Sequence, residues 1–277
     1  MAYQTSQKIQ PHVKIEAQGH LLHVRSVGAR DGPKIKRRGT VEGFSHQSRM
    51  RLFRKLARVK APDHPGYRSN VSFLTLTTRV HYHPRVLKHL AQLLFKRITR
   101  KYARLSVVWR LEFQKRGAPH LHCLLYNAPW IDREWLVANW GELVDQEKPV
   151  VDIRRVKSYR QLMSYVSKYV AKVGDSSLLD IGTKNAAAAK IWDGMPRNVG
   201  RLWGVWNADC LPFAELEKGV VPLDGSWWMI RQYCRKFYNS IWDDEESGFT
   251  IFVDDPYHAL RHIVKLAESF GAYSIAV

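Results

Sequence analysis

Cysteine is scarce in this chain of 277 residues. The three cysteines, Cys123, Cys210 and Cys234, form no CxxC spacing and are odd in number. This usage argues against disulfides and against a cysteine-rich zinc site, and it is typical of a reducing compartment. The sequence also lacks an apolar run near the roughly 18 residues of a membrane span, and it lacks an apolar signal core at its start. We therefore expect a soluble, cytoplasmic protein with no membrane partner.

Acidic residues are also few: 25 Asp and Glu face 44 Lys and Arg, which gives a formal net charge of +19. Such a field attracts polyanions and drives non-specific binding to phosphates. Charge alone does not distinguish an enzyme from a ribosomal or chromatin-like binder. The acidic residues gather late in the chain, at 243–246 and 254–255. We interpret that run as a solvated loop, with screening of the basic surface or mimicry of DNA as alternatives.

Composition and periodicity divide the chain into three parts. Residues 1–44 are interpreted as a basic N-terminal arm, with at most a short strand at 20–25. Residues 45–210 form the main domain. Residues 211–277 form a mixed, partly helical segment that holds the acidic run. Its helices are expected at 225–242 and 257–270, and we interpret its tryptophans, Trp227, Trp228 and Trp242, as core residues.

The main domain shows the clearest periodicity. A helix is expected from Ser45, followed by a strand at 73–78, a helix at 84–102, strands at 106–114 and 120–127, a helix at 132–140, a strand at 150–154 and a helix at 158–173. This order predicts an α+β fold with the split βαβ arrangement of a ferredoxin-like antiparallel sheet. In that topology the first and third strands are central neighbours. Residues 200–206 are expected to add a further strand.

Alternation along these strands sorts their residues into two faces. One face is apolar and is expected to lie under the helices: Leu74, Leu76, Trp109, Leu111, Phe113, Leu121, Cys123 and Leu125. The other face is polar and open: Thr75, Thr77, Arg110, Glu112, His120 and His122. A co-facial set of hydroxyls, imidazoles and a carboxylate is hard to explain as core packing, so it indicates a site.

The strongest metal-binding pattern is His120-Leu121-His122, in which both imidazoles project from one side of a strand. Glu112 lies on the preceding strand of the same hairpin and can reach the same point. Two imidazoles and one carboxylate leave coordination positions open, as in a catalytic metal site. Mg²⁺ or Mn²⁺ suits chemistry on phosphates, and the imidazoles favour Mn²⁺. The alternative is a pair of surface histidines with ordinary hydrogen bonds.

A second pattern lies in the helix expected at 158–173: Tyr165 and Tyr169 are one turn apart, and each is followed three residues later by a lysine, Lys168 or Lys172. A phenol is a poor nucleophile until it is ionised, and a nearby ammonium group or a metal-bound phosphate favours the phenolate. We interpret the tyrosines as nucleophiles toward phosphate. The alternative is that they pack as amphipathic core residues, with the lysines extended into solvent.

These motifs resemble those of the rolling-circle replication initiators of the HUH superfamily. Residues 73–77 resemble the first motif, 112–122 the second, and 165–172 the third, in the paired form of two-tyrosine initiators of phages and plasmids. Residues 200–204 are also similar to a segment that follows the tyrosine helix in this group. The resemblance covers about residues 40–210. It implies the HUH endonuclease fold, with helices on one face of the sheet and the tyrosine-bearing helix at the open face.

The resemblance further implies site-specific nicking of single-stranded origin DNA through a 5′-phosphotyrosine, followed by rejoining. His120, His122 and Glu112 would hold the Mg²⁺ or Mn²⁺, and Tyr165, Tyr169, Lys168 and Lys172 would be catalytic. We expect nucleic-acid contacts from Thr75, Thr77, Arg110, Lys115 and Arg116. No Walker A motif is present, so a host helicase and the host replication machinery are expected partners, in the host cytoplasm if a phage encodes the chain.

Two other functions are compatible with the pattern. A tyrosine transposase of the same superfamily would use similar motifs, although such proteins are usually smaller and have one tyrosine. A non-catalytic single-strand binder would stack bases on exposed aromatic residues of a ferredoxin-like sheet. The central strands here present Thr and His on the polar face instead of paired aromatic residues, which disfavours this alternative.

Overall fold

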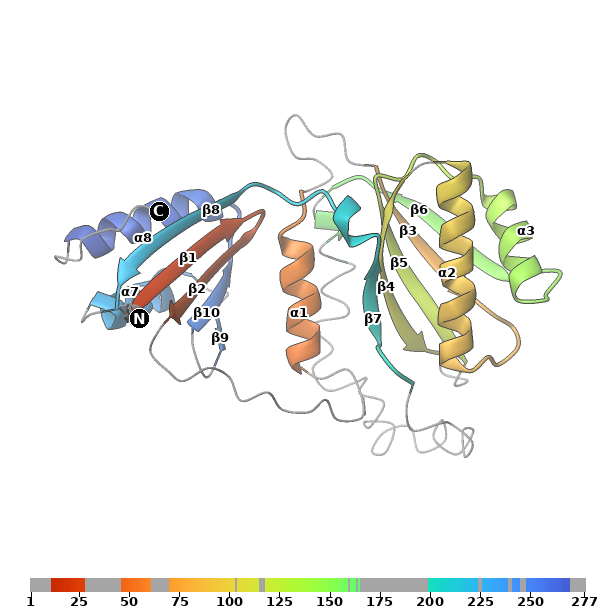
Figure 1. Cartoon of the computed structure of the whole chain (residues 1–277), viewed down its shortest axis with the longest axis horizontal. Helices are drawn as coiled ribbons and strands as arrows, with labels where there is room; N and C mark the ends of the chain where they lie inside the picture. The colour runs from red at the N-terminus through yellow and green to blue at the C-terminus, as the bar shows by residue number, and fades with distance from the viewer. Residues whose placement is uncertain are drawn as a thin grey trace, which may run out of the picture. The chain divides into compact units, whose positions relative to one another are not determined.

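The computed structural model describes residues 11–27, 46–60, 70–102, 104–114, 118–158, 160–162, 164, 199–223, 226–238, 241–244 and 248–269. The chain divides into two compact units, and each has its own five-stranded antiparallel sheet (Figure 1). The first unit joins residues 1–37, 54–59 and 213–277, and the second joins 38–53 and 60–212. Helix α1 (His46–Ala57) therefore contributes residues to both units. Within the described ranges, no helix is long and apolar enough to cross a membrane.

The second unit has the predicted order of elements. They are β3 (Val71–Thr77), α2 (Pro84–Lys101), β4 (Ser106–Phe113), β5 (Pro119–Tyr126), α3 (Arg133–Leu143), β6 (Val150–Val156) and β7 (Trp203–Trp206). Its sheet has the order β6-β3-β5-β4-β7, and every neighbouring pair is antiparallel. The ferredoxin-like α+β prediction is confirmed, with β3 and β5 as central neighbours. Strand β7 confirms the further strand expected at 200–206 and extends the sheet beyond β4.

Local capping explains where the helices of this unit begin. The His83 side chain accepts a hydrogen bond from the Arg85 backbone N–H, and Pro84 occupies the first turn of α2. Asp132 caps α3 by accepting from the Trp135 backbone N–H at 2.7 Å. The helix predicted from Ser158 begins as expected, because Ser158 Oγ accepts from the Gln161 backbone N–H at 3.2 Å. Its continuation from Tyr165 lies outside the described residues.

Helices α2 and α3 lie on the same side of this sheet (Figure 1). The register pairs Leu74 with Cys123 and Leu76 with Leu121, and all four side chains are buried. Phe95 of α2 contacts the Trp206 ring of β7, with ring centroids 6.0 Å apart. The apolar face is therefore the face under the helices, as alternation predicts.

The polar face is less open than predicted. Thr77 and Arg110 are each only 7% exposed. Trp203, which is paired with Arg110 across β4 and β7, donates its indole N–H to Ser48 Oγ of α1 at 2.9 Å. The first half of α1 therefore covers part of this face beside β7.

The first unit joins segments from both ends of the chain. They are β1 (His12–Gln18), β2 (Leu21–Val27), β8 (Leu216–Pro222), α7 (Ser226–Phe237), β9 (Ile241–Asp244), β10 (Gly248–Phe252) and α8 (Pro256–Ser269), with the strand order β8-β1-β2-β10-β9. The structure thus differs from the predicted division, in which residues 1–44 are an arm separate from 211–277. The pairing of β1 with β8 joins residues about two hundred positions apart, so local periodicity gives no sign of it.

The tryptophans of this unit differ from the prediction of a shared core. Trp227 packs against the core that α7 and α8 form with the sheet. Trp228 is 66% exposed, so its prediction as a core residue is wrong. The two residues are neighbours on a helix, about 100° apart around its axis, and only one of them can face the sheet. The helix predicted to reach Trp242 ends at Phe237, and Trp242 belongs to β9.

Candidate metal centre

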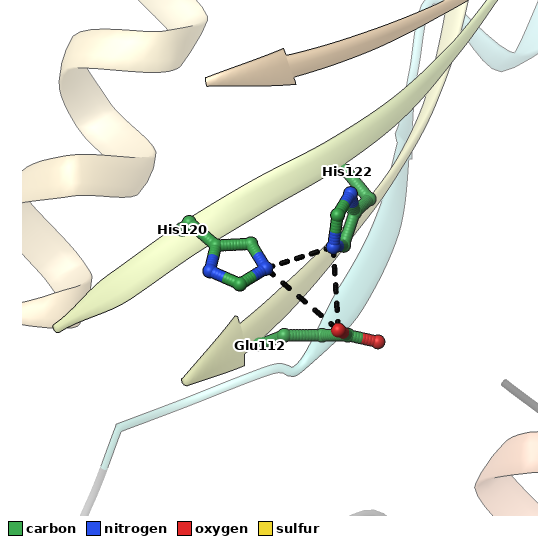
Figure 2. A group of neighbouring side chains, drawn as sticks. All are labelled: Glu112, His120 and His122. Atoms are coloured by element: carbon green, nitrogen blue, oxygen red, sulfur yellow. Dashed lines mark hydrogen bonds and ion pairs between the residues drawn. The ribbon is translucent and has the colours of Figure 1, made fainter. Parts of the chain in front are cut away.

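Two adjacent strands of the second unit bring the predicted metal ligands together. Glu112 on β4 is the register partner of His120 on β5, and His122 is the next residue on the same face. The three side chains point toward one another (Figure 2). The two Nε2 atoms are 2.8 Å apart, and Glu112 Oε2 lies 3.2 Å from His122 Nε2 and 3.7 Å from His120 Nε2. Strand alternation and the antiparallel register are sufficient to build this cluster.

These separations fit a single metal ion. Ligands about 2.1 Å from a cation lie about 3.0 Å apart in an octahedral site and about 3.4 Å apart in a tetrahedral one. The three donor atoms, two Nε2 and one Oε2, span that range. The side chains are half-buried, which restricts their motion yet leaves a way in from solvent. Glu112, His120 and His122 can therefore hold a metal ion with coordination positions left for other ligands.

The His122 ring is held from two sides. Thr75 Oγ1 on β3 lies at hydrogen-bond distance, 3.2 Å, from His122 Nδ1. When Nδ1 carries the ring proton and donates it to Thr75, the Nε2 lone pair faces the other two donors. The Phe73 ring stacks on the imidazole with centroids 5.5 Å apart. Phe73 is 6% exposed, so it packs against the site and offers no platform for a stacked base.

Arg110 supports the carboxylate of the centre. Its Nη1 lies 3.0 Å from Glu112 Oε1, while the other oxygen, Oε2, faces the imidazoles. Burial by itself raises the pKa of Glu112. Hydrogen bonds from His120 and His122 and the charge of Arg110 outweigh that effect, so the pKa lies well below its usual value. Glu112 is therefore an anion at neutral pH, the form that binds a cation.

The structure places the other predicted site residues as follows. Thr77 is the register partner of His120 and lies on the same face, beside the metal ligands. Cys123 lies on the opposite face and is buried, which raises the pKa of its thiol and agrees with its prediction as a core residue. The remaining predicted residues lie outside the described ranges: Lys115, Arg116, Tyr165, Lys168, Tyr169 and Lys172.

Sequence reasoning placed Thr75 and Arg110 on the correct face but assigned them to nucleic-acid contacts. The structure adds a contact from each to a predicted metal ligand. The signal for both was present in the register, because Thr75 and Arg110 are the partners of His122 on its two neighbouring strands. Alternation gives the face of a side chain, whereas its hydrogen-bond partner also depends on its rotamer.

Fold and site together define a class: a ferredoxin-like α+β domain with a two-histidine, one-carboxylate centre on its central strands. Residues 71–174 match a family model of replication-associated proteins, the ORF2 family. This range contains every predicted site residue from Thr75 to Lys172. The predicted resemblance to rolling-circle replication initiators is thus confirmed at the level of the family.

A curated relative supports the same assignment over a longer range. The chain is 24% identical over 210 residues to a replication-associated protein of Pseudomonas phage Pf3. The alignment covers 72% of this chain and 69% of that protein. No solved structure matches the chain significantly.

Proposed function

We propose that this protein nicks and rejoins single-stranded DNA by metal-dependent transesterification, and so initiates the rolling-circle replication of a phage or plasmid. The convergence of Glu112, His120 and His122 on one point carries the proposal. The match of residues 71–174 to a replication-associated family and the formal net charge of +19 support it. Single-stranded origin DNA is the proposed substrate, in the host cytoplasm, with a host helicase to open the duplex.

The metal ligands and their neighbours have separate tasks in this proposal. Glu112, His120 and His122 hold Mg²⁺ or Mn²⁺, which when bound polarises the phosphate that is to be cut. Thr75 orients the His122 ring, and Arg110 holds the Glu112 oxygen that faces away from the imidazoles. Thr77, Lys115 and Arg116 are proposed to contact the DNA, as are the parts of Thr75 and Arg110 that the ligands leave accessible.

The tyrosines supply the nucleophiles. The phenolate oxygen of Tyr165 or Tyr169 attacks the phosphorus of a phosphodiester, the bond to the 3′ oxygen breaks, and that oxygen leaves as a 3′-OH after it takes up a proton. Lys168 and Lys172 stabilise the phenolate or the phosphate. The 5′-phosphotyrosine retains the energy of the broken bond, so a 3′-OH can attack it and restore the DNA. Two tyrosines allow two such steps in succession without release of the DNA.

A covalent-adduct assay tests this function. The protein is incubated with Mn²⁺ and labelled single-stranded origin DNA, and the adduct is separated on a denaturing gel and mapped by mass spectrometry. We expect wild-type protein to form an adduct on Tyr165 or Tyr169, and the double variant Tyr165→Phe/Tyr169→Phe to form none. Chelation of the metal with EDTA should also abolish the adduct.

Tyr102→Phe is the matched control, because Tyr102 contacts Trp135 and Lys101 through its ring, which phenylalanine keeps. This variant should form the adduct at the wild-type rate. An adduct that persists in the double variant would refute the roles of the two tyrosines. Wild-type binding of the same DNA without any Mn²⁺-dependent adduct would favour the non-catalytic alternative.

A further inference from the structure

The sheet of the first unit has a polar face that the proposed reaction does not use. Helices α7 and α8 pack on the opposite face, around a core that includes Ile15, Val24 and Phe249. On the polar face the register pairs Lys14 with Arg25 and Glu16 with His23 across β1 and β2. His23 Nδ1 lies 3.1 Å from Thr250 Oγ1 on β10, so this row extends across three strands.

The end of α1 adds two arginines to this face. The Ala57 carbonyl accepts from the His20 backbone N–H at 2.8 Å, and the Arg58 carbonyl accepts from the Ala214 backbone N–H at 2.9 Å. These bonds fix the last turn of α1 against the β1–β2 turn. Arg54 and Arg58, from this turn and the residue after it, act electrostatically on His23, and Arg58 also acts on Glu16. All of these residues belong to the first unit.

The charge on this face is predominantly positive. Glu16 is paired with Lys14, with Nζ and Oε1 2.9 Å apart. Burial lowers the pKa of Arg58; Glu16 opposes this effect, and the charges of Arg54 and Arg25 add to it. His23 carries no charge at neutral pH, because burial and the nearby arginines lower its pKa to about 4. The register continues from Arg25 through Gly248 to Asp244 of β9, which places an acidic position at one rim.

Like charges held together in a partly buried place are unfavourable unless an anion joins them. Guanidinium groups are well suited to phosphate, because their planar fork donates two parallel hydrogen bonds. A chain of phosphates can contact several of these groups at once, which a single small anion cannot do. The acidic rim does not cancel the three arginines, and the formal net charge of the chain, +19, favours a polyanion over a neutral partner.

We propose that Lys14, Arg25, Arg54 and Arg58, here called the basic face, bind the sugar–phosphate backbone of single-stranded DNA at a second surface separate from the metal centre. The contact is with phosphates, so it is independent of sequence. It would retain the strand while the metal centre acts on one phosphodiester. The choice of single-stranded DNA as the polyanion rests on the proposed function, whereas the phosphate chemistry does not.

Binding of labelled oligothymidylate, measured by fluorescence anisotropy in EDTA over a range of salt concentrations, tests the proposal. The variant Arg25→Gln/Arg54→Gln/Arg58→Gln should bind at least 10-fold more weakly near 0.1 M salt. The slope of log K against log salt should fall by about 2, since each lost phosphate contact on a single strand accounts for about 0.7. No metal or cleavage is needed, so a failure here is distinct from a failure of the proposed nicking reaction.

The control variant Arg235→Gln/Lys236→Gln/Lys265→Gln removes the same net charge from exposed positions of α7 and α8, which cover the other face of the sheet. It should change the affinity by less than about 3-fold, because its charges act only through the general field. Equal losses in the two triple variants would overturn the proposal, as would an unchanged slope in the first. Inorganic phosphate that competes as well as oligothymidylate at equal phosphate concentration would also overturn it.

Folding of the first triple variant is checked by thermal melting without DNA. We expect a melting temperature equal to or above that of wild type, because repulsion between the arginines is relieved. If the triple variant unfolds, Arg25→Gln alone replaces it, since Arg25 is exposed and its loss leaves no buried gap. The single variant should lose about 0.7 of the salt slope, and wild-type binding by that variant would contradict the proposal.

Discussion

At the scale of single residues, Thr75 determines how His122 presents its ring nitrogens. The hydroxyl lies 3.2 Å from Nδ1, so a ring proton on Nδ1 leaves Nε2 free to face Glu112 and His120. We expect Thr75→Val to weaken Mn²⁺ binding by roughly 10- to 100-fold, the usual cost of removing the hydrogen-bond partner of a metal-bound histidine. Isothermal titration calorimetry on the whole chain measures this loss.

Two variants of the same strand control this prediction. Thr75→Ser keeps the hydroxyl and should retain most of the affinity. Thr77→Val makes the same change at a buried threonine of the same face, whose Cα partner is His120. It should cost less than Thr75→Val. Equal losses at the two threonines would mean that the β-branched packing of β3, and not the hydrogen bond, supports the centre.

The metal ligands could be predicted from sequence because their geometry follows from strand periodicity alone. His120 and His122 must share a face, and a tight hairpin brings Glu112 opposite His120. The contact between Arg110 and Glu112 could not be predicted, since it depends on how one long side chain turns on a crowded surface. The roles of Tyr165 and Tyr169 stay predictions, because those residues lie outside the described ranges.

At the scale of elements, the packing of α1 against β2 links stability to pH through His23. Burial and the arginines of α1 lower its folded-state pKa to about 4, whereas in the unfolded chain it titrates near 6.5. Above pH 6.5 the neutral ring costs nothing in either state. As the pH falls from about 6.5 to 4, the unfolded chain takes up a proton that the folded chain refuses, so stability falls by up to about 3 kcal/mol.

Urea denaturation at a series of pH values from 7.5 to 4.5 measures this effect. Other groups also titrate in this range, so the informative quantity is the difference between wild type and His23→Gln, which keeps a polar group near Thr250. We expect that difference to shift in favour of the variant as the pH falls. His89→Gln, at an exposed histidine of α2, should follow the wild-type curve. Parallel curves for wild type and His23→Gln would show that α1 does not keep the ring neutral.

The elements themselves were predictable in proportion to the locality of their contacts. Strands β3 to β6 alternate clearly, and α2 and α3 begin at capping residues that a sequence reader can recognise. Helix α8 also follows a proline and closely matches the predicted range of 257–270. Strands β1 and β8 each find their partner across most of the chain, and β9 begins where a continued helix was expected. Pairings of that kind have no local signal.

At the scale of the whole molecule, one unit is assembled from distant parts of the sequence. The central strands of its sheet, β1 and β2, come from residues 12–27, whereas α7 and α8, which cover the sheet, come from residues 226–269. Val13, Ile15, Ala17, Leu22 and Val24 are fully buried among them. We expect deletion of residues 1–27 to unfold the segment from Leu216 to Ser269, although about 190 residues separate the two along the chain.

The reason for this expectation is that deletion leaves β8 and β10 without the strands between them, and it exposes the apolar faces of α7 and α8. Hydrogen exchange followed by mass spectrometry measures the result peptide by peptide. Protection should be lost in peptides from 216–222 and 256–269, while β3 and β5 of the other unit keep theirs. Deletion of residues 1–10 alone leaves β1 and β2 whole and should preserve protection throughout. If peptides from α8 stay protected after loss of residues 1–27, the C-terminal elements fold by themselves, and the N-terminal segment is the separable arm that its composition suggests.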